Sequence, residues 1–205
     1  MNVPALYRKY FVDKRDERSE LFQLMRDNFT ITSGIYPGSF THITPSFYIP
    51  EMVYVDMDKR CKKFFDDEET IHFINDKKIY NEEATVRFHQ QDFSDTIDEK
   101  ENEFNLMLSL YSGFISRYCK KYLRKDGFLL VNNSHGDATL AFCDDAYELI
   151  GVVKRNGQQF SLSSKDLQSY FETKSGKPID MENVEKTMRG PAYRKPVYGY
   201  IFQKG

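Results

Sequence analysis

The chain has 205 residues, of which 40% are hydrophobic and 29% charged. This composition is typical of a globular domain and excludes a largely disordered chain. The formal net charge of −2 does not suit a surface that neutralises phosphates, so nucleic acid is disfavoured as a partner. We expect a single domain over residues 1–205, with residues 1–30 as an N-terminal helical lead-in.

Cysteine usage and hydrophobic run lengths exclude two further classes. The three cysteines are widely spaced and form no Cys-x-x-Cys pair, so the sequence predicts neither a disulfide framework nor a metal site. The first 20 residues are charged within eight positions and contain no apolar core of a signal peptide. No apolar run approaches the ~20 residues of a transmembrane helix. We therefore expect a cytoplasmic protein with no membrane partner, and the oligomeric state is left open.

The first predicted elements are a helix and two strands. Apolar residues at helical spacing predict a helix over residues 16–29. Residues 31–36 then form a strand that opens into Pro37, Gly38 and Ser39. Residues 52–55 form a second strand, which ends on Asp56, 18 positions after Gly38. This spacing is typical of consecutive strands in a nucleotide-binding sheet, where a tight turn admits the cofactor and an acid accepts ribose hydroxyls.

The rest of the chain alternates between strands and helices. Residues 104–110 (FNLMLSL) are a nearly continuous apolar run, as in a central parallel strand covered on both faces. Asn156-Gly157 is a strong hairpin turn. Helices are predicted over residues 60–65, 70–79, 113–124, 137–142, 166–171 and 181–188, and strands over 84–89, 104–110, 128–132, 147–155 and 197–203, with 159–162 as a possible hairpin partner. This alternation predicts an α/β fold with helices on both faces of a parallel sheet and an antiparallel end.

From about Glu20 to Gln203 this pattern resembles the class I S-adenosylmethionine-dependent methyltransferases. The resemblance is carried by the turn PGS, the acid in YVDMD, the acid in QQDF and the segments NLMLSLYSGF and KKYLRKDGFLLVN. It implies a Rossmann-like, doubly wound, mostly parallel seven-stranded sheet with an antiparallel C-terminal edge. It also implies S-adenosyl-L-methionine as the cofactor, and methyl transfer to a small molecule or other undetermined acceptor as the activity.

The resemblance implies roles for individual residues. Asp56 would bind the ribose, Asp92 would lie beside the adenine, and the exit of the fourth strand would face methionine and substrate. The implied cofactor-binding residues are Tyr36, Pro37, Gly38, Ser39, Asp56, Asp92, Ser109, Leu110 and Tyr111. From the residues alone, Asp56 has a second interpretation as the cap of the following helix, and Asp58 competes with it for either role.

The first loop departs from the family pattern. Family members usually carry an acid followed by Gly-x-Gly after the first strand, whereas IYPGSF has one glycine, no acid and a proline without an amide donor. A degenerate methyltransferase fold that serves as a non-catalytic binding or regulatory module is therefore the alternative function. Methylation of exocyclic base nitrogens is disfavoured, because no Asn/Asp-Pro-Pro-aromatic tetrapeptide follows the fourth strand.

The densest polar cluster, residues 132–137, follows a predicted buried strand at the edge where ligands bind in open α/β sheets. His135 could act there as a general base, because an imidazole titrates near neutrality. Asp137 could orient His135 or cap the helix that follows. The structural alternative is an Asx or Ser turn in which Gly136 supplies an unusual backbone angle. We predict His135 and Asp137 as the catalytic residues.

Overall fold

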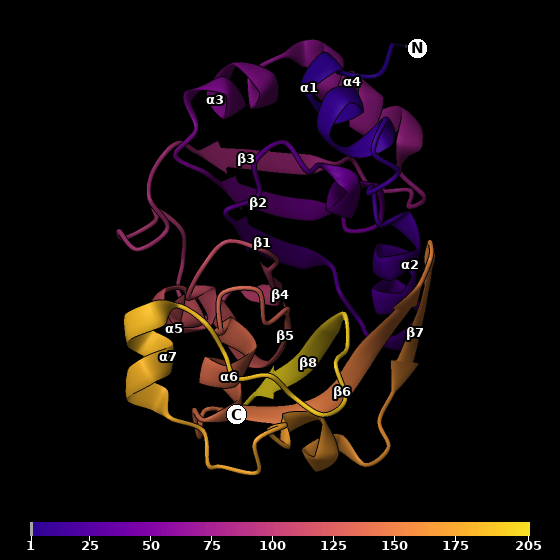
Figure 1. Ribbon diagram of the computed structural model, residues 1–205. Coiled ribbons are helices and arrows are strands. Elements are labelled where there is room, and N and C mark those ends of the chain that lie inside the picture. The colour runs from indigo at the N-terminus through magenta and orange to yellow at the C-terminus, as the bar shows by residue number, and fades with distance from the viewer. Residues whose placement is uncertain (1) are drawn as a thin grey trace.

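One sheet of eight strands organises the molecule, in the order β3-β2-β1-β4-β5-β8-β6-β7. The computed structural model describes residues 2–205 and is shown in Figure 1. Strands β1 to β5 are mutually parallel, β8 is antiparallel to both of its neighbours, and β7 is antiparallel to β6. The strands are β1 (Ser33–Pro37), β2 (Glu51–Val55), β3 (Thr85–His89), β4 (Phe104–Ser109), β5 (Leu123–Val131), β6 (Tyr147–Asn156), β7 (Gln159–Ser163) and β8 (Gly199–Lys204).

This architecture confirms the predicted Rossmann-like sheet with an antiparallel C-terminal edge. The sheet has eight strands rather than seven, because β7 folds back on β6 through the Asn156-Gly157 turn and joins its edge. Gly157 adopts a φ of +62° at this turn, which favours glycine. The expected neighbours β4 and β5 are parallel and central, and all six residues of β4 are buried.

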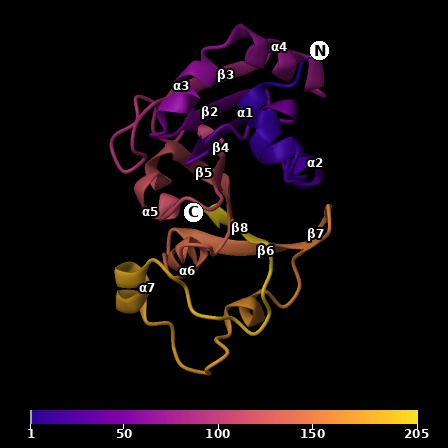
Figure 2. The same ribbon diagram turned by 45° about the horizontal axis from the view of Figure 1, so that its top comes forward.

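Helices cover both faces of the sheet, as Figures 1 and 2 show. One core contains Leu21 and Phe22 of α2 together with Phe64 of α3. The opposite core contains Ile115 of α5 and Ala138 of α6. No helix within residues 2–205 has both the length and the apolar character needed to cross a bilayer. The helices are α1 (Ala5–Tyr7), η1 (Arg8–Val12), α2 (Ser19–Asn28), η2 (Thr44–Phe47), α3 (Lys59–Phe65), α4 (Glu68–Lys77), α5 (Ile115–Tyr118), η3 (Lys120–Tyr122), α6 (Asp137–Phe142), η4 (Leu167–Phe171) and α7 (Met181–Thr187).

The connection from β1 to β2 contains only the short 3-10 helix η2, with Pro45 in its first turn. The N-terminal segment packs against this connection. Tyr7 forms a buried hydrogen bond with Thr44, and the Phe11 ring stacks on His42 at 4.4 Å between ring centroids. N-terminal residues therefore contribute to the packing of the connection that leads out of the β1 loop.

The predicted helix over residues 113–124 is wrong in its second half. The helix α5 ends at Tyr118 and is followed by the single turn η3, and β5 already begins at Leu123. Leu123 pairs with Phe104 of β4, and the register shifts before Phe128. Tyr122 is buried, and its hydroxyl hydrogen-bonds the backbone of Ile97. Tertiary strand pairing thus overrides the helical periodicity here.

Candidate active site

The carboxyl ends of the parallel strands meet at one edge of the sheet, which faces the viewer in Figure 1. Strand β1 lies between β2 and β4, so the direction of winding reverses between β1 and β4. Ligands of open α/β sheets bind in the crevice at such a reversal. The residues that sequence reasoning selected follow β1, β2, β3, β4 and β5, so they come together at this edge.

Gly38 joins the loops that follow β1 and β4. Its amide donates to the Val55 carbonyl at 2.7 Å, and its own carbonyl accepts a hydrogen bond from Ser112 Oγ at 2.8 Å. Gly38 has a φ of +66°, and a Cβ at this position would lie 2.2 Å from Ser112 Cβ. Only glycine therefore fits at position 38 of this loop.

Asp56 links the loop after β1 to the start of α3. Its Oδ2 accepts the Phe40 amide and its Oδ1 accepts the Asp58 amide, both at 2.8 Å. The carboxylate is partly exposed, and each oxygen can accept a further hydrogen bond. The residue that caps α3 is Asp58, whose carboxylate accepts the Arg60 amide. The capping role therefore belongs to Asp58, whereas ribose binding by Asp56 stays a prediction.

Asp92 lies beyond β3 and is partly exposed. It accepts hydrogen bonds from the Ser94 amide and hydroxyl, and these lower the pKa of its carboxyl. The side chains of Phe93 and Met188 approach Gly113, where an added Cβ would lie 3.3 Å from Phe93 Cζ and 3.6 Å from Met188 Cε. Neither was selected from the sequence: Phe93 directly follows the selected Asp92, whereas Met188 follows α7 and is remote from the other site residues in the chain.

The three predicted residues at the end of β4 have different environments. Ser109 is buried and donates to the Asp137 carboxylate, and Leu110 is buried in the α2 core. Tyr111 is 50% exposed and adopts a φ of +68°, which is strained for a residue with a side chain. Of these three side chains, only Tyr111 presents a substantial surface at the edge.

The other predicted residues of the first loop, Tyr36, Pro37 and Ser39, are buried. Tyr36 is buried beside His42, and burial raises the pKa of its phenol to about 12, although the nearby Arg18 charge opposes this. Pro37 is buried and pairs in register with Val55 as the last residue of β1. Ser39 is buried, and its hydroxyl donates to the Phe40 carbonyl. These three residues fix the backbone of the loop around Gly38.

His135 lies at the same edge of the sheet as Gly38 and Asp56, in the loop that follows β5. It is partly exposed, and its Nδ1 hydrogen-bonds Ser134 Oγ at 3.0 Å. Asp137 points elsewhere: it is 1% exposed and accepts hydrogen bonds from Ser109 Oγ and from the Ser116 amide and hydroxyl. Burial raises the pKa of Asp137 to about 6, against the lowering effect of these hydrogen bonds. Asp137 therefore ties α6 to β4 and α5, and through α6 it fixes the loop that carries His135.

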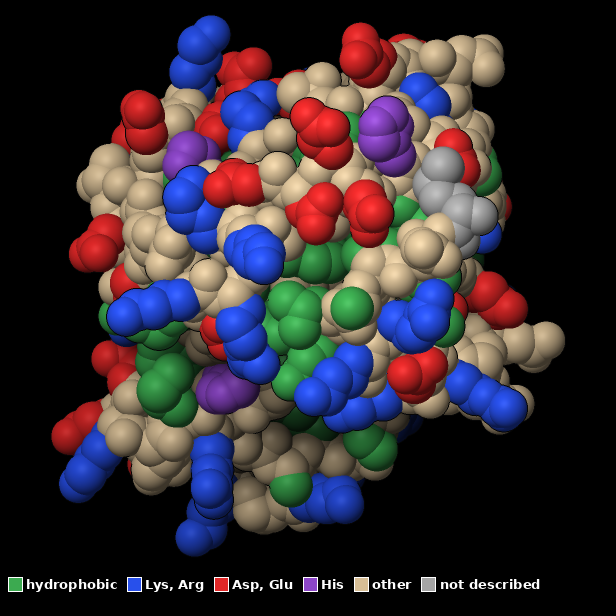
Figure 3. All heavy atoms as spheres, turned by 90° about the horizontal axis from the view of Figure 1, so that it is seen from above, with side chains coloured by type: hydrophobic (Ala, Val, Ile, Leu, Met, Phe, Trp, Pro, Cys, Tyr) green, Lys and Arg blue, Asp and Glu red, His purple; other side chains and the backbone are tan. Residues whose placement is uncertain are grey.

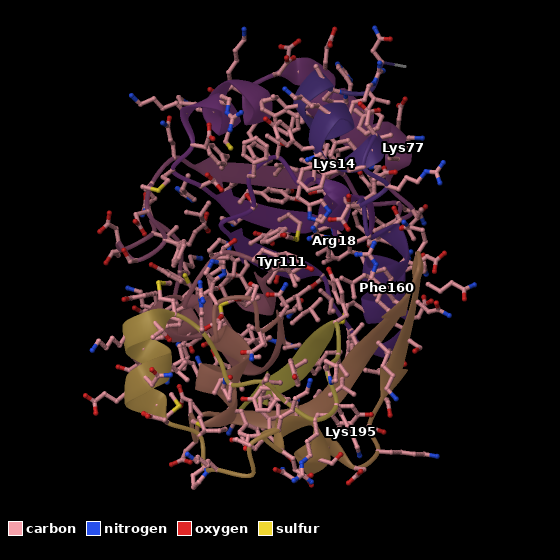
Figure 4. All side chains as sticks on the ribbon, in the orientation of Figure 1. Lys14, Arg18, Lys77, Tyr111, Phe160 and Lys195 are labelled. Carbon is pink, nitrogen blue, oxygen red and sulfur yellow. The ribbon has the colours of Figure 1, made fainter. Side chains whose placement is uncertain are left out.

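Four residues at this edge were not selected from the sequence. Arg18 is buried and lies over the Tyr111 ring at 5.1 Å from its centroid, as Figure 4 shows. Asn132 is 5% exposed, and its Oδ1 accepts the Tyr111 amide. The other two are Arg155 at the end of β6 and Tyr198, which precedes β8. No local pattern marks them, because they come from distant parts of the chain and meet only in the folded protein.

Two surface cavities beside α3 have volumes of about 630 and 520 Å³. They share Lys59, Lys63 and Asp67, so their walls mix both signs of charge. Figure 3 likewise shows basic and acidic side chains interspersed over this surface of the molecule. The residues that line these cavities include neither Gly38 nor Asp56, so these cavities are separate from the residues at the carboxyl edge.

The residues at the edge fit S-adenosylmethionine at Asp56, whose two carboxylate oxygens can each accept a further hydrogen bond. Gly38 lacks a Cβ where Ser112 packs against it, so the loop after β4 lies directly against the first loop beside Asp56. The Asn132 Nδ2 donor is buried without a hydrogen-bond partner in residues 2–205. Asp56 adds an acceptor at the end of β2. The edge therefore provides both an acceptor for hydroxyl groups and an unused donor.

This chain is similar to known proteins in fold but not in sequence. No family model and no curated protein matches the sequence. Several solved structures are similar in fold. They include the N-methyltransferase NodS from Bradyrhizobium japonicum in complex with S-adenosyl-L-homocysteine, with a TM-score of 0.54 and 8% identity over 99% of this chain and 93% of that chain. A methyltransferase from Thermotoga maritima, described as a possible histamine N-methyltransferase, has a TM-score of 0.53 and 11% identity over 98% and 94% of the two chains.

A protein from Corynebacterium glutamicum is similar at the same level, with a TM-score of 0.53 and 10% identity over 78% of this chain and 88% of that chain. Identities this low establish the fold alone. The chain therefore has the fold of the class I S-adenosylmethionine-dependent methyltransferases.

Proposed function

We propose that this protein binds S-adenosylmethionine at the carboxyl edge of its sheet and catalyses methyl transfer to a small molecule or other acceptor. One observation carries the proposal: the loops after β1, β2 and β4 are joined into a single cradle at the reversal of strand order. The Phe40 amide binds Asp56, the Gly38 amide binds Val55, and Ser112 binds the Gly38 carbonyl. Such a cradle places the Asp56 carboxylate at the point where the strand order reverses, which is where open α/β sheets bind nucleoside cofactors.

Each part of the cofactor has a corresponding group on the chain. Asp56 accepts hydrogen bonds from the ribose hydroxyls, and Asp92 accepts from the adenine amino group. Phe93 and Met188, which both approach the Cβ position of Gly113, supply apolar surface for the adenine ring. Gly38 allows the cofactor to lie against the backbone of the first loop. These assignments are consistent with the fold of NodS, whose solved structure holds S-adenosyl-L-homocysteine.

When bound, S-adenosylmethionine supplies an electrophilic methyl group on a positively charged sulfur. The chain's principal task is to hold the acceptor in line with that methyl group. Arg18 lies over one face of the half-exposed Tyr111 ring, and we assign the remaining face to the positive sulfur, because aromatic faces attract cations. His135 takes the proton that the acceptor loses, and Asp137 acts as a positioning residue that holds the His135 loop. Removal of His135 therefore affects the transfer step more than cofactor binding.

Calorimetric titration tests the proposal directly. The wild-type protein should bind S-adenosylmethionine and S-adenosylhomocysteine and should not bind NADH. Asp56→Ala should raise the dissociation constant for either adenosyl ligand about tenfold or more, because a charge-assisted hydrogen bond contributes about 1.5–3 kcal/mol. Asp58→Ala is the matched control, since Asp58 caps α3 and pairs with Arg60.

The outcomes separate the hypotheses. Unchanged affinity in Asp56→Ala, with a normal melting temperature, would remove Asp56 from the site. Absence of binding to both adenosyl ligands by the folded wild-type protein would contradict the proposal. That result would instead favour the non-catalytic binding module, which the irregular first loop suggested.

A further inference from the structure

A cluster of charged and aromatic side chains surrounds Tyr111 on the β4–β5–β8 side of the crevice. The Tyr111 ring lies beneath the guanidinium of Arg18, which precedes α2 (Figure 4). The guanidinium of Arg155, from the end of β6, lies 5.6 Å from the centroid of the Tyr198 ring. The positive charge of Arg18 also opposes the rise in pKa that burial causes in the Tyr36 and Tyr198 phenols. Segments from the two ends of the chain thus form one cluster beside the proposed cofactor cradle.

The charges of this cluster do not balance. Arg18 Nε donates to Asp16 Oδ2 at 3.1 Å, and Arg155 Nη1 donates to Asp16 Oδ1 at 3.0 Å. One carboxylate therefore serves two guanidinium groups. Although burial opposes it, the hydrogen bonds from both arginines hold the pKa of Asp16 below its usual value, so Asp16 is ionised. The nearby Glu17 carboxylate is directed to the Tyr7 hydroxyl. The cluster keeps one excess positive charge, stabilised by aromatic faces.

Two polar atoms in the cluster lack a hydrogen-bond partner within the described residues 2–205. They are the Asn132 Nδ2 amide and the Tyr198 hydroxyl, and both atoms are buried. Burial raises the pKa of Tyr198, and the Tyr111 phenol is close enough to the Tyr198 hydroxyl to add to that rise, but the two make no hydrogen bond of normal length. Unpaired buried polar groups are rare in folded proteins, and each one calls for an explanation such as a missing ligand. Asn132 is held in place by the hydrogen bond that its Oδ1 accepts from the Tyr111 amide, so its unused donor is fixed beside the Tyr111 loop.

The protonation of the cluster makes it a set of donors. Burial raises the pKa of the Tyr36 and Tyr198 phenols, so both are neutral hydroxyls at physiological pH. Burial, assisted by the Arg18 charge, lowers the pKa of His42 to about 3, so its imidazole adds no charge. An excess positive charge with unused N–H and O–H donors matches an anion with two acceptor oxygens better than a neutral or cationic group.

We propose that Arg18, Arg155, Asn132 and Tyr198 form a subsite that binds the carboxylate of the methyl acceptor. This inference rests on the proposed function, which puts the cofactor against Gly38 and Asp56. Ser112 contacts Gly38 and directly follows Tyr111, so the subsite begins where the cofactor cradle ends. An acceptor held here by its carboxylate extends toward the crevice between β1 and β4. The neutral phenol rings of Tyr111 and Tyr198 supply apolar contact for the rest of such an acceptor.

The probe for the test is benzoate, with benzamide as its uncharged counterpart. Both are titrated calorimetrically into the wild-type protein that has been saturated with S-adenosylhomocysteine. Benzoate should bind at least about tenfold more tightly than benzamide, because hydrogen bonds to an ionised group are roughly twice as strong as neutral ones. Benzylamine should not compete with benzoate. Equal binding of benzoate and benzamide would overturn the inference.

Single substitutions test which residues bind benzoate. Arg155→Gln and Tyr198→Phe should each weaken benzoate binding by about tenfold, while the melting temperature stays within a few degrees of wild type. Both are chosen over Arg18 because Arg18 is buried, and its loss risks unfolding. Arg194→Gln is the matched control, since Arg194 is exposed and pairs with Glu172 outside the cluster. Unchanged benzoate affinity in both test variants would refute the proposed residues.

The cofactor itself carries a carboxylate, and a second pair of ligands distinguishes it from the acceptor. 5′-Methylthioadenosine lacks the amino-acid portion of S-adenosylhomocysteine. If the subsite serves the acceptor, Arg155→Gln and Tyr198→Phe leave the affinity for both adenosyl ligands unchanged. If those variants weaken S-adenosylhomocysteine alone, and benzoate binds only to the unliganded protein, the subsite belongs to the cofactor, and the acceptor assignment is wrong. Failure of wild type to bind either adenosyl ligand would refute the proposed function instead.

Discussion

The two halves of the carboxyl edge differ in how completely their polar groups are paired. In the β1–β2 half, the Asp56 carboxylate and the Gly38 amide are hydrogen-bonded to neighbouring backbone. In the β4–β5–β8 half, Asn132 Nδ2 and the Tyr198 hydroxyl are buried without partners in the described residues, and one carboxylate serves two arginines. The first half is a rigid cradle that is complete by itself, whereas the second half leaves polar groups that a ligand would satisfy.

This difference shows how one fold can combine a fixed cofactor site with an adaptable acceptor site. Groups that the backbone already pairs lose little freedom when a cofactor binds, so the geometry of the cradle is set before binding. Unpaired donors discriminate among ligands, because a ligand without matching acceptors leaves them unsatisfied. On the proposed function, the cradle suits a cofactor that never changes, and the cluster around Tyr111 is the part of the site that would select the acceptor.

The largest expected effect is on turnover. His135→Ala should lower the rate of methyl transfer by about 10²–10⁴-fold, the usual contribution of a positioned acid–base group. Its melting temperature and its affinity for S-adenosylhomocysteine should match wild type, since His135 is partly exposed and bonds only to Ser134 among the described residues. The rate is measured with the first acceptor obtained from a screen of carboxylates. If the variant turns over the acceptor as fast as the wild type does, His135 is only part of the turn that precedes α6.

The largest expected effect on stability comes from Asp137, only two residues away. Asp137→Ala leaves the Ser109 and Ser116 donors buried without an acceptor. We expect the free energy of unfolding to fall by about 3 kcal/mol or more, because each unsatisfied buried group costs about 1–3 kcal/mol. Chemical denaturation measures the change. Asp137→Asn should be milder, since it retains one acceptor oxygen. A stable Asp137→Ala protein that binds cofactor but is inactive would indicate a direct catalytic role.

Asp137 should also leave a signature in the pH dependence of stability. The pKa of this carboxyl is about 6 in the folded protein, above the ~3.9 of an unfolded aspartate. A raised folded pKa contributes stability that is fully present below about pH 4 and is lost as the pH rises through 6. The contribution is at most about 3 kcal/mol, at 1.36 kcal/mol for each pH unit.

Comparison with Asp137→Asn isolates this contribution. Other carboxyls have lowered pKa values and act in the opposite direction, including Asp16, Glu99 and Asp144. The difference in unfolding free energy between wild type and Asp137→Asn should therefore decrease from pH 4 to pH 7. A difference that stays flat or increases over this range would contradict the raised pKa.

The smallest expected change is the loss of stability caused by a side chain at position 38. Gly38→Ala should lower the free energy of unfolding by about 2 kcal/mol, partly because a φ of +66° is unfavourable for alanine. The remainder reflects the approach of the new Cβ to 2.2 Å from Ser112 Cβ. Adding Ser112→Gly should restore the part caused by the clash and leave the part caused by φ. If the second substitution restores nothing, the contact between the two loops is not maintained in solution.

Much of the fold was readable from the sequence. The continuous apolar run FNLMLSL predicted the central strand β4, because a strand buried on both faces cannot alternate with polar residues. The strand, helix and turn signals after Asp137 were accurate to within a few residues. The spacing of Gly38 and Asp56 correctly indicated that the two lie together, because consecutive parallel strands end at the same edge.

What the sequence did not reveal depends on contacts between distant segments. The pattern of residues 113–124 suits one helix, yet the pairing of Leu123 with Phe104 converts its end into strand β5. Arg18 lies in the charged run DKRDERSE, which is typical of a solvated surface, yet folding buries it against Tyr111. Local patterns determined the order and type of the elements and the acid at the end of β2. Only the tertiary structure decided which charges are buried, because burial depends on partners that lie far away in the chain.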